Sequence, residues 1–149
     1  MKLDEILINN QTDIINEAFI CLQRSHLKHY DSSQADENWQ RLAKLFDLTL
    51  NGVKSKSLVE MVTYSEKIAK ERYESGFNLH EVHTAYNVLE ESIWKAIIKE
   101  IDSADLAESL GLISTVLGTG KESLALAYVS LSGKQRVKSL NLSQLFRGK

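Results

Sequence analysis

The sequence of 149 residues contains no proline, although roughly seven would be expected at the usual frequency of about 5%. Proline marks loops, turns and strand edges, so its absence argues against a loop-rich fold. One cysteine cannot form an internal disulfide or a multi-cysteine metal site. No apolar run approaches the roughly 18–20 residues that cross a membrane, and the N-terminus has no apolar signal segment. These absences indicate one cytoplasmic domain of long helices with short connections.

The net charge of −2 conceals an uneven distribution along the chain. Residues 134–149 hold five basic side chains and no acidic one, whereas the preceding 133 residues carry a balance of −7. We therefore divide the chain into a helical bundle domain at residues 1–133 and a basic C-terminal tail or linker at residues 134–149. A short basic tail on an acidic body is weak evidence for a nucleic-acid interface. We expect neither nucleic-acid nor membrane binding.

Apolar residues recur at spacings of three and four along most of the chain, which predicts five helices. The predicted helices run from Leu3 to His29, from a Ser33 cap to Asn51-Gly52, from a Ser57–Glu60 capping box to Gly76, from an Asn78–Glu81 capping box to Ile101, and from Asp102 or Ser103 to Leu131 as one long helix. Short connectors make neighbouring helices antiparallel. We predict an all-α fold, an antiparallel bundle of four main helices plus one additional helix. A further amphipathic segment is expected between Val137 and Phe146.

The four histidines form two pairs, His26/His29 and His80/His83, each with a spacing of three. Neither pair lies in the Glu-x-x-His pattern of carboxylate-bridged iron bundles. The His80 pair is also one residue short of the zinc protease motif His-Glu-x-x-His. We expect no metal site and no cofactor.

A more specific hypothesis is phosphotransfer. His80, Glu81 and Thr84 resemble the phosphoacceptor box of sensor histidine kinases. In such a box the acid acts as general base on the imidazole and the threonine orients a water molecule. The sequence differs from that box at two positions. Ala85 stands where the kinase family has proline, and His83 stands where that family has its basic residue. No glycine-rich nucleotide-binding segment accompanies the box. A phosphotransfer protein with His80 as acceptor therefore stays an alternative, and we expect no catalytic residues and no enzyme.

The segment from Leu58 to Leu131 carries a recurring pattern: a helix ending at Gly76, a helix beginning Leu79-His80-Glu81, and a last helix with Ala127-Tyr128 near its end. This pattern resembles the helical N-terminal domains of bacterial partner-switching regulators, namely stressosome co-antagonists of the RsbR type and RsbU-type phosphatases. Related domains precede some sensor kinases. The resemblance implies a dimeric helix bundle that receives a signal or docks a partner protein and has no catalytic residue.

We therefore predict a non-catalytic signalling domain of a bacterial stress response that forms a homodimer and docks a regulatory protein. The partner would be a kinase, a phosphatase or a response regulator. The predicted binding residues are His80, Thr84, Asn87 and Glu91 on the exposed side of the fourth helix and Gly120 on the last helix. Gly120 also falls on the apolar stripe of its helix, where the missing side chain permits the close approach of another helix. Trp94 is slightly off the centre of its apolar stripe, which favours a groove or dimer surface. A small-ligand sensor with a cavity inside the bundle is a further alternative.

Overall fold

The backbone of residues 2–139 and the side chains of residues 2–134 are described by a computed structural model. Helices form all the regular structure of that span, and no strand occurs within it. The predicted all-α class is therefore confirmed. The helices of the described span are α1 (Leu3–Asn9), α2 (Gln11–Arg24), α3 (Lys28–Ser32), α4 (Ala35–Ser55), α5 (Val59–Glu74), α6 (Leu79–Glu100) and α7 (Ser103–Ser139).

The first thirty residues differ from the prediction, because three short helices replace one long one. α1 and α2 meet at Asn10, whose side-chain amide donates to the Ile6 carbonyl and to the Glu100 carboxylate, both at 2.8 Å. An asparagine that bonds to nearby backbone competes with the helical pattern. α2 ends shortly before His26, whose φ of 48° lies in the left-handed region. The predicted single helix from Leu3 to His29 is therefore wrong. The prediction misses both breaks because the apolar spacing continues across them.

α4 continues through Asn51-Gly52, where the sequence predicts its end. The helix stops at Ser55, and Lys56 follows in the left-handed conformation with φ 54°. A Cβ placed on Gly52 would lie 2.9 Å from Cγ1 of Val116 on α7. Glycine in a helix interior costs about 1 kcal/mol relative to alanine, and here it allows the close approach of α7. The predicted helix end at Asn51-Gly52 is therefore wrong, because Gly52 allows α4 to pack against α7 and does not end the helix.

Two of the three predicted caps are also wrong. Ser33 and Ser57 each lie one residue before the cap position of α4 and α5, and neither helix has a side-chain cap. The third is confirmed, because Oδ1 of Asn78 accepts from the Glu81 N–H at 3.0 Å and the Glu81 carboxylate accepts from the Asn78 N–H at 2.9 Å. Gly76, with φ 91°, follows the end of α5 as predicted.

α7 has 37 residues and confirms the prediction of one long last helix that passes Gly118 and Gly120 without interruption. The predicted close approach at Gly120 is also confirmed. A Cβ there would lie 2.8 Å from Sδ of Met61 on α5 and 2.9 Å from Cε2 of Tyr86 on α6. Three helices therefore meet at one residue without a side chain.

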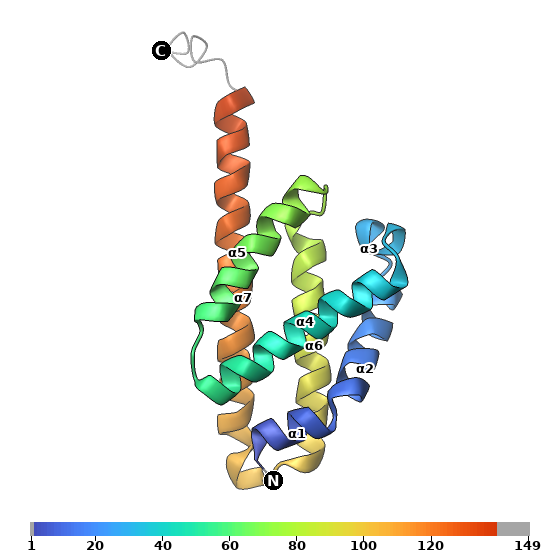
Figure 1. The fold of residues 1–149 in the computed structure, drawn as a ribbon, viewed down its shortest axis with the longest axis vertical. Helices are drawn as coiled ribbons and strands as arrows, with labels where there is room; N and C mark the ends of the chain where they lie inside the picture. Colours follow the sequence, from blue (N-terminus) through green and yellow to red (C-terminus); the bar gives the residue numbers. More distant parts are fainter. Residues whose placement is uncertain (1, 140–149) are drawn as a thin grey trace.

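The C-terminal end of α7 extends past the turn between α5 and α6 (Figure 1). The helix is described to Ser139, so it continues past the predicted boundary at residue 133. The rest of the predicted basic tail, residues 140–149, lies outside the described residues, and so does most of the further amphipathic segment expected there.

α5, α6 and α7 alternate in direction, with α5 and α6 both packed against α7 and α2 packed against α6 (Figure 1). α4 crosses this group obliquely and touches α2, α5, α6 and α7. The finer prediction of four aligned main helices plus one is therefore not confirmed. The core between these helices includes the fully buried side chains of Phe46, Met61, Tyr86, Leu89 and Ile93.

Candidate functional site

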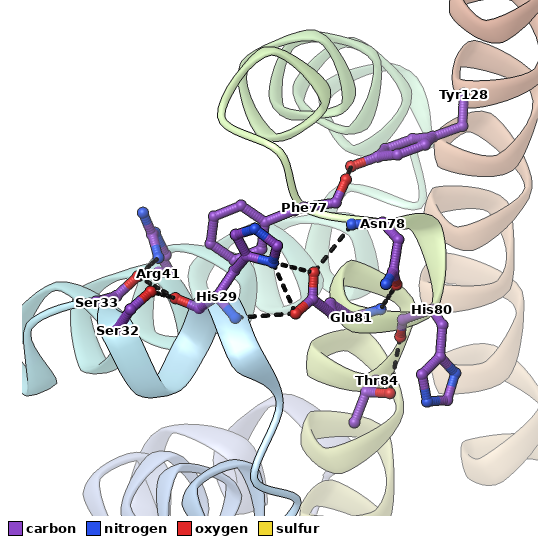
Figure 2. A network of polar contacts seen from close by, with 10 residues as sticks. All are labelled: His29, Ser32, Ser33, Arg41, Phe77, Asn78, His80, Glu81, Thr84 and Tyr128. Carbon is purple, nitrogen blue, oxygen red and sulfur yellow. Dashed lines mark hydrogen bonds and ion pairs between the residues drawn. The ribbon is translucent and has the colours of Figure 1, made fainter.

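Glu81, the acid that follows His80 in the sequence, lies in the interior with only 3% of its surface exposed. One carboxylate oxygen accepts from the backbone N–H of His29 at 2.9 Å. The Nδ1 atom of the same histidine lies 3.0 and 2.8 Å from the two carboxylate oxygens. Together with the Asn78 N–H, these contacts surround the carboxylate (Figure 2). Glu81 therefore ties α3 to the first turn of α6.

The charge of Glu81 is set by this arrangement. Burial by itself raises the pKa of the carboxyl group. Hydrogen bonds from the backbone of His29 and Asn78, and from the His29 side chain, more than offset burial and hold the pKa below its usual range. Glu81 is therefore ionised at neutral pH and acts as a positioning residue for the helix start.

Phe77, in the turn between α5 and α6, lies among cationic and aromatic side chains. The guanidinium carbons of Arg41 and Arg72 are 5.4 and 5.8 Å from the centre of its ring. The His29 ring centre lies 5.1 Å away. The Tyr128 hydroxyl donates to the Phe77 carbonyl at 2.9 Å (Figure 2). Residues of α3, α4, α5 and α7 therefore converge on this one turn.

A groove of about 640 Å³ lies between this turn and the far end of α7. Its size falls within the range of roughly 300–1,000 Å³ seen for ligand sites. Burial raises the pKa of Tyr128 to about 12, so its hydroxyl keeps its proton and its bond to the turn. The residues that line the groove are Tyr73, Gly76, Phe77, Asn78, Leu79, Tyr128, Val129, Ser132 and Gly133.

The four binding residues predicted on α6 share one side of that helix, because their spacings are four, three and four. His80 and Glu91 are exposed, and Thr84 and Asn87 are half-buried. The Thr84 hydroxyl donates to the His80 carbonyl at 2.8 Å, within its own helix (Figure 2). The predicted residues therefore form a continuous polar strip that starts beside the turn at Phe77.

Two apolar side chains extend this strip toward the end of α6. Trp94 is 36% exposed, in agreement with its predicted surface position, and Ile98, one turn further on, is 58% exposed. The sequence gives little sign of Ile98, because its neighbour Ile97 fills the buried stripe. The adjacent isoleucines look alike in the sequence but lie about 100° apart around the helix.

α7 packs against α6 next to this strip. Nζ of Lys121 on α7 is 2.6 Å from Oε1 of Glu90 on α6, which marks the side of α7 that faces α6. Gly118 lies roughly 60° around α7 from Lys121, and Gly111 lies seven residues before it on the same side. A Cβ on either glycine would have no neighbouring atom within 4 Å in the described part of the chain. We call this surface the α6–α7 face; its residues are His80, Thr84, Asn87, Glu91, Trp94, Ile98, Gly111 and Gly118.

Two predicted site residues lie elsewhere. Gly120 is buried where α5, α6 and α7 meet, so it offers no surface to a partner. The Glu81 carboxylate is directed toward His29, whereas the His80 ring projects away from it (Figure 2). The phosphoacceptor alternative requires Glu81 as a base on the His80 imidazole, and the structure does not bring these two groups together.

The histidine pairs do not converge on a common point. His26 Nδ1 lies 3.7 Å from an Asp31 carboxylate oxygen, whereas His29 is bound to Glu81. Across residues 2–134, no group of three or more His, Cys, Asp or Glu side chains is arranged to hold a metal ion. None of the helices in the described part of the chain is long and apolar enough to cross a bilayer.

Comparison with known families identifies the type of domain. A family described as the RsbT co-antagonist protein rsbRD N-terminal domain matches residues 20–130, which is well over half of the chain. The chain belongs to this family. The match confirms the resemblance found between Leu58 and Leu131 and extends it back to α2. The family is a regulatory, non-catalytic domain. Neither the curated proteins nor the solved structures compared with the chain include a match.

Proposed function

We propose that this chain is a non-catalytic, cytoplasmic signalling domain that forms a homodimer and docks a regulatory protein of a bacterial stress response. The observation that carries the proposal is the α6–α7 face. It joins a polar strip, two exposed apolar side chains and two uncovered glycines on adjacent helices. Membership of the RsbRD N-terminal family supports a regulatory protein as the partner.

The apolar half of the face suits self-association. Gly111 and Gly118 are seven residues apart, and among the described residues no atom lies within 4 Å of the position that a Cβ would take on either of them. The distance between two packed helices depends on the side chains at their contact, so a pair of glycines permits close approach. Trp94 and Ile98 lie on the adjoining helix and would lose their exposed surface in a symmetric pair. A second copy of the chain is therefore the occupant we assign to this half.

The polar half of the face suits a different partner. His80 follows Leu79, which lines the groove of about 640 Å³ beside the turn at Phe77. Asn87 and Thr84 continue the strip with amide and hydroxyl groups, which supply hydrogen bonds at a rim. A kinase, phosphatase or response regulator of a partner-switching pathway would bind there.

Sedimentation velocity tests the dimer. We expect a dimer at high micromolar concentration, weakened roughly 30-fold or more by Trp94→Ala because a buried tryptophan is a typical hot spot. Gly118→Leu should give monomer, since its side chain blocks helix approach. Ser130→Leu, about 120° around α7 from Gly118, and Val59→Ala, on an exposed part of α5, are matched controls that should remain dimeric. A monomeric wild type, or a dimer unaffected by both face variants, would refute this assignment.

Calorimetric titration tests the docking half separately. One of the three regulator classes from the same genome should bind, and His80→Ala with Asn87→Ala should weaken binding roughly tenfold or more. Glu66→Ala, on the exposed side of α5, is the control and should bind normally. If none of the three classes binds while the dimer forms, docking is rejected and self-association stands.

A further inference from the structure

Two apolar features of the chain have no role in the α6–α7 face. One is the groove of about 640 Å³ beside the turn at Phe77, and the other is the amphipathic sequence near the C-terminus. The cavity between α4, α5 and α6, by comparison, has only about 20 Å³. That is roughly the space of a single water molecule, which is too small for an organic ligand of the kind a sensor bundle would hold.

The surface of the groove is mostly apolar. Val129 of α7 lines it and is 67% exposed, and Leu126, three residues earlier on the same helix, is 63% exposed. Gly133, four residues after Val129, also lines the groove, and a Cβ on it would have no neighbour within 4 Å among the described residues. An exposed apolar surface that continues into open space is typical of a binding site.

Polar groups in the lining are already bonded within the chain. The Tyr128 hydroxyl donates to the Phe77 carbonyl at 2.9 Å, and Oδ1 of Asn78 accepts from the Glu81 N–H at 3.0 Å. A charged or strongly polar ligand would lose its hydration in this groove without gaining equivalent bonds. The groove therefore suits an occupant with apolar side chains.

The sequence of residues 140–149, which lie outside the described residues, supplies such side chains. Leu142 is followed by Leu145 and Phe146 at spacings of three and four. Arg147 and Lys149 are basic, and the ten residues include no acidic one. The pattern predicts a segment with one apolar side, which is stable only when another surface covers that side.

α7 brings this segment within reach of the groove. Ser139, the last residue of α7, comes six residues after Gly133 and ten after Val129. At a rise of 1.5 Å per residue, these positions lie about 9 and 15 Å back along the helix axis. The eight residues 142–149 span up to about 26 Å when extended. The chain can therefore reverse after Ser139 and cover the whole groove.

The charges beside the groove are compatible with the same segment. Glu74, the last residue of α5, is exposed, and the final carbonyl groups of that helix add partial negative charge. Lys134 is exposed as well, but it is nearer to the end of α7, where the returning chain has uncharged residues. Arg147 and Lys149 come later in the segment, beyond Lys134 along the return path.

We propose that residues 142–146 of this chain fold back along α7 and occupy the groove, with Leu142, Leu145 and Phe146 as apolar anchors against Val129. A segment tethered so close to its site has an effective concentration in the millimolar range, so a weak contact is sufficient. The docked segment would remove the exposed surface of Val129 from water and cover the turn at Phe77 from outside.

Nuclear magnetic resonance of the full chain, labelled with 13C and 15N, tests the proposal. Backbone order parameters of residues 142–146 should be about 0.85, as in rigid backbone, rather than below about 0.6, as in a free segment. Nuclear Overhauser contacts should join the Phe146 ring to the Val129 methyl groups. Order parameters of a free segment, or no contact with any groove residue, would overturn the proposal.

A mixture of labelled and unlabelled chains identifies the occupant. Contacts between Phe146 and Val129 that arise within one chain support the proposal. If they arise only between a labelled and an unlabelled chain, the groove binds the segment of a second copy, and docking within the chain is wrong.

Matched variants locate the segment. Val129→Asp places a charge in the groove and should lower the order parameters of residues 142–146 below about 0.6. Val59→Asp is the control, because Val59 on α5 is equally exposed at 70%, and it should leave them unchanged. If Val129→Asp does not fold, Phe146→Ser replaces it, with Gln144→Ser as its control. Order that persists in the variant used would place the segment elsewhere and refute the assignment.

Discussion

Replacing Glu81 with glutamine preserves the shape of the side chain and removes the charge that holds α3 against α6. The carboxylate accepts from the N–H groups of His29 and Asn78 and contacts the His29 ring, all within 3.0 Å. A glutamine side chain has one acceptor oxygen instead of two. Its amide NH2 must then face one of the two backbone N–H groups, donor against donor.

The magnitude follows from these contacts. A hydrogen bond to a charged group contributes about 1.5–3 kcal/mol, and a buried donor left without an acceptor costs about 1–3 kcal/mol. Glu81→Gln weakens several charged bonds and leaves one backbone donor unpaired, so we expect it to lower the free energy of unfolding by about 3 kcal/mol. For a domain of this size that corresponds to a fall in Tm of about 6–12 °C.

Urea unfolding followed by circular dichroism measures this difference, and an unchanged m-value shows that the variant folds to a similar extent. Glu91→Gln is the matched control, because Glu91 is on the same helix but exposed, and it should change stability by no more than about 0.5 kcal/mol. A loss below about 1 kcal/mol for Glu81→Gln would refute the reasoning, since it would mean that the buried carboxylate does not hold the helix start.

The pH dependence gives the same prediction a second readout. The folded pKa of Glu81 lies below that of the unfolded chain. Its stabilisation is therefore fully present above the unfolded value of about 4.3 and is lost as the pH falls through the folded value. The stability difference between wild type and Glu81→Gln should accordingly shrink as the pH falls below about 4.

Further predictions concern the helix contacts. Gly120→Ala should destabilise by about 1–3 kcal/mol in a urea titration, because its Cβ would lie within 3 Å of two side chains. Gly111→Ala, in open space on the same helix of the single chain, should instead stabilise by about 0.5–1 kcal/mol when titrated at a concentration that keeps the protein monomeric, and an equal effect at the two sites would contradict the packing. Glu90→Gln should cost about 1–2 kcal/mol by leaving Lys121, 19% exposed, without its partner, and a neutral result would show that solvent replaces the pair. Incubation with acetyl phosphate should leave no acid-labile label, and a label that His80→Gln abolishes would restore the phosphotransfer alternative.

The sequence predicts the long helices well, because their apolar spacing and their short connections carry the signal. The Asn78–Glu81 cap and the glycine contact at Gly120 are both predicted from local spacing and confirmed. The break at Asn10 is missed, since the apolar stripe keeps its phase across it. Gly52 is interpreted as a helix end because its actual neighbour, Val116, is 64 residues away in the sequence and cannot be seen locally.

The candidate site, too, is predicted only in part from the sequence. His80 and Glu81 look like one chemical unit in the sequence, but consecutive residues on a helix point about 100° apart. His80 is therefore exposed, and Glu81 is turned into the interior toward His29, which comes from a helix 52 residues earlier. The pair of arginines beside Phe77 is equally invisible in the sequence. Arg41 and Arg72 are brought together only when α4 and α5 pack around Phe77.

α7 has a mechanical consequence for how a signal would leave this domain. A continuous helix of 37 residues is about 55 Å long. It packs against α4, α5 and α6, while its last turns project beyond the α5–α6 turn. A tilt of about 5° of the whole helix about its first turn would displace the far end by roughly 5 Å, close to the rise of one helical turn. Such a tilt would convert a small repacking in the core into a larger movement at the C-terminal end of α7.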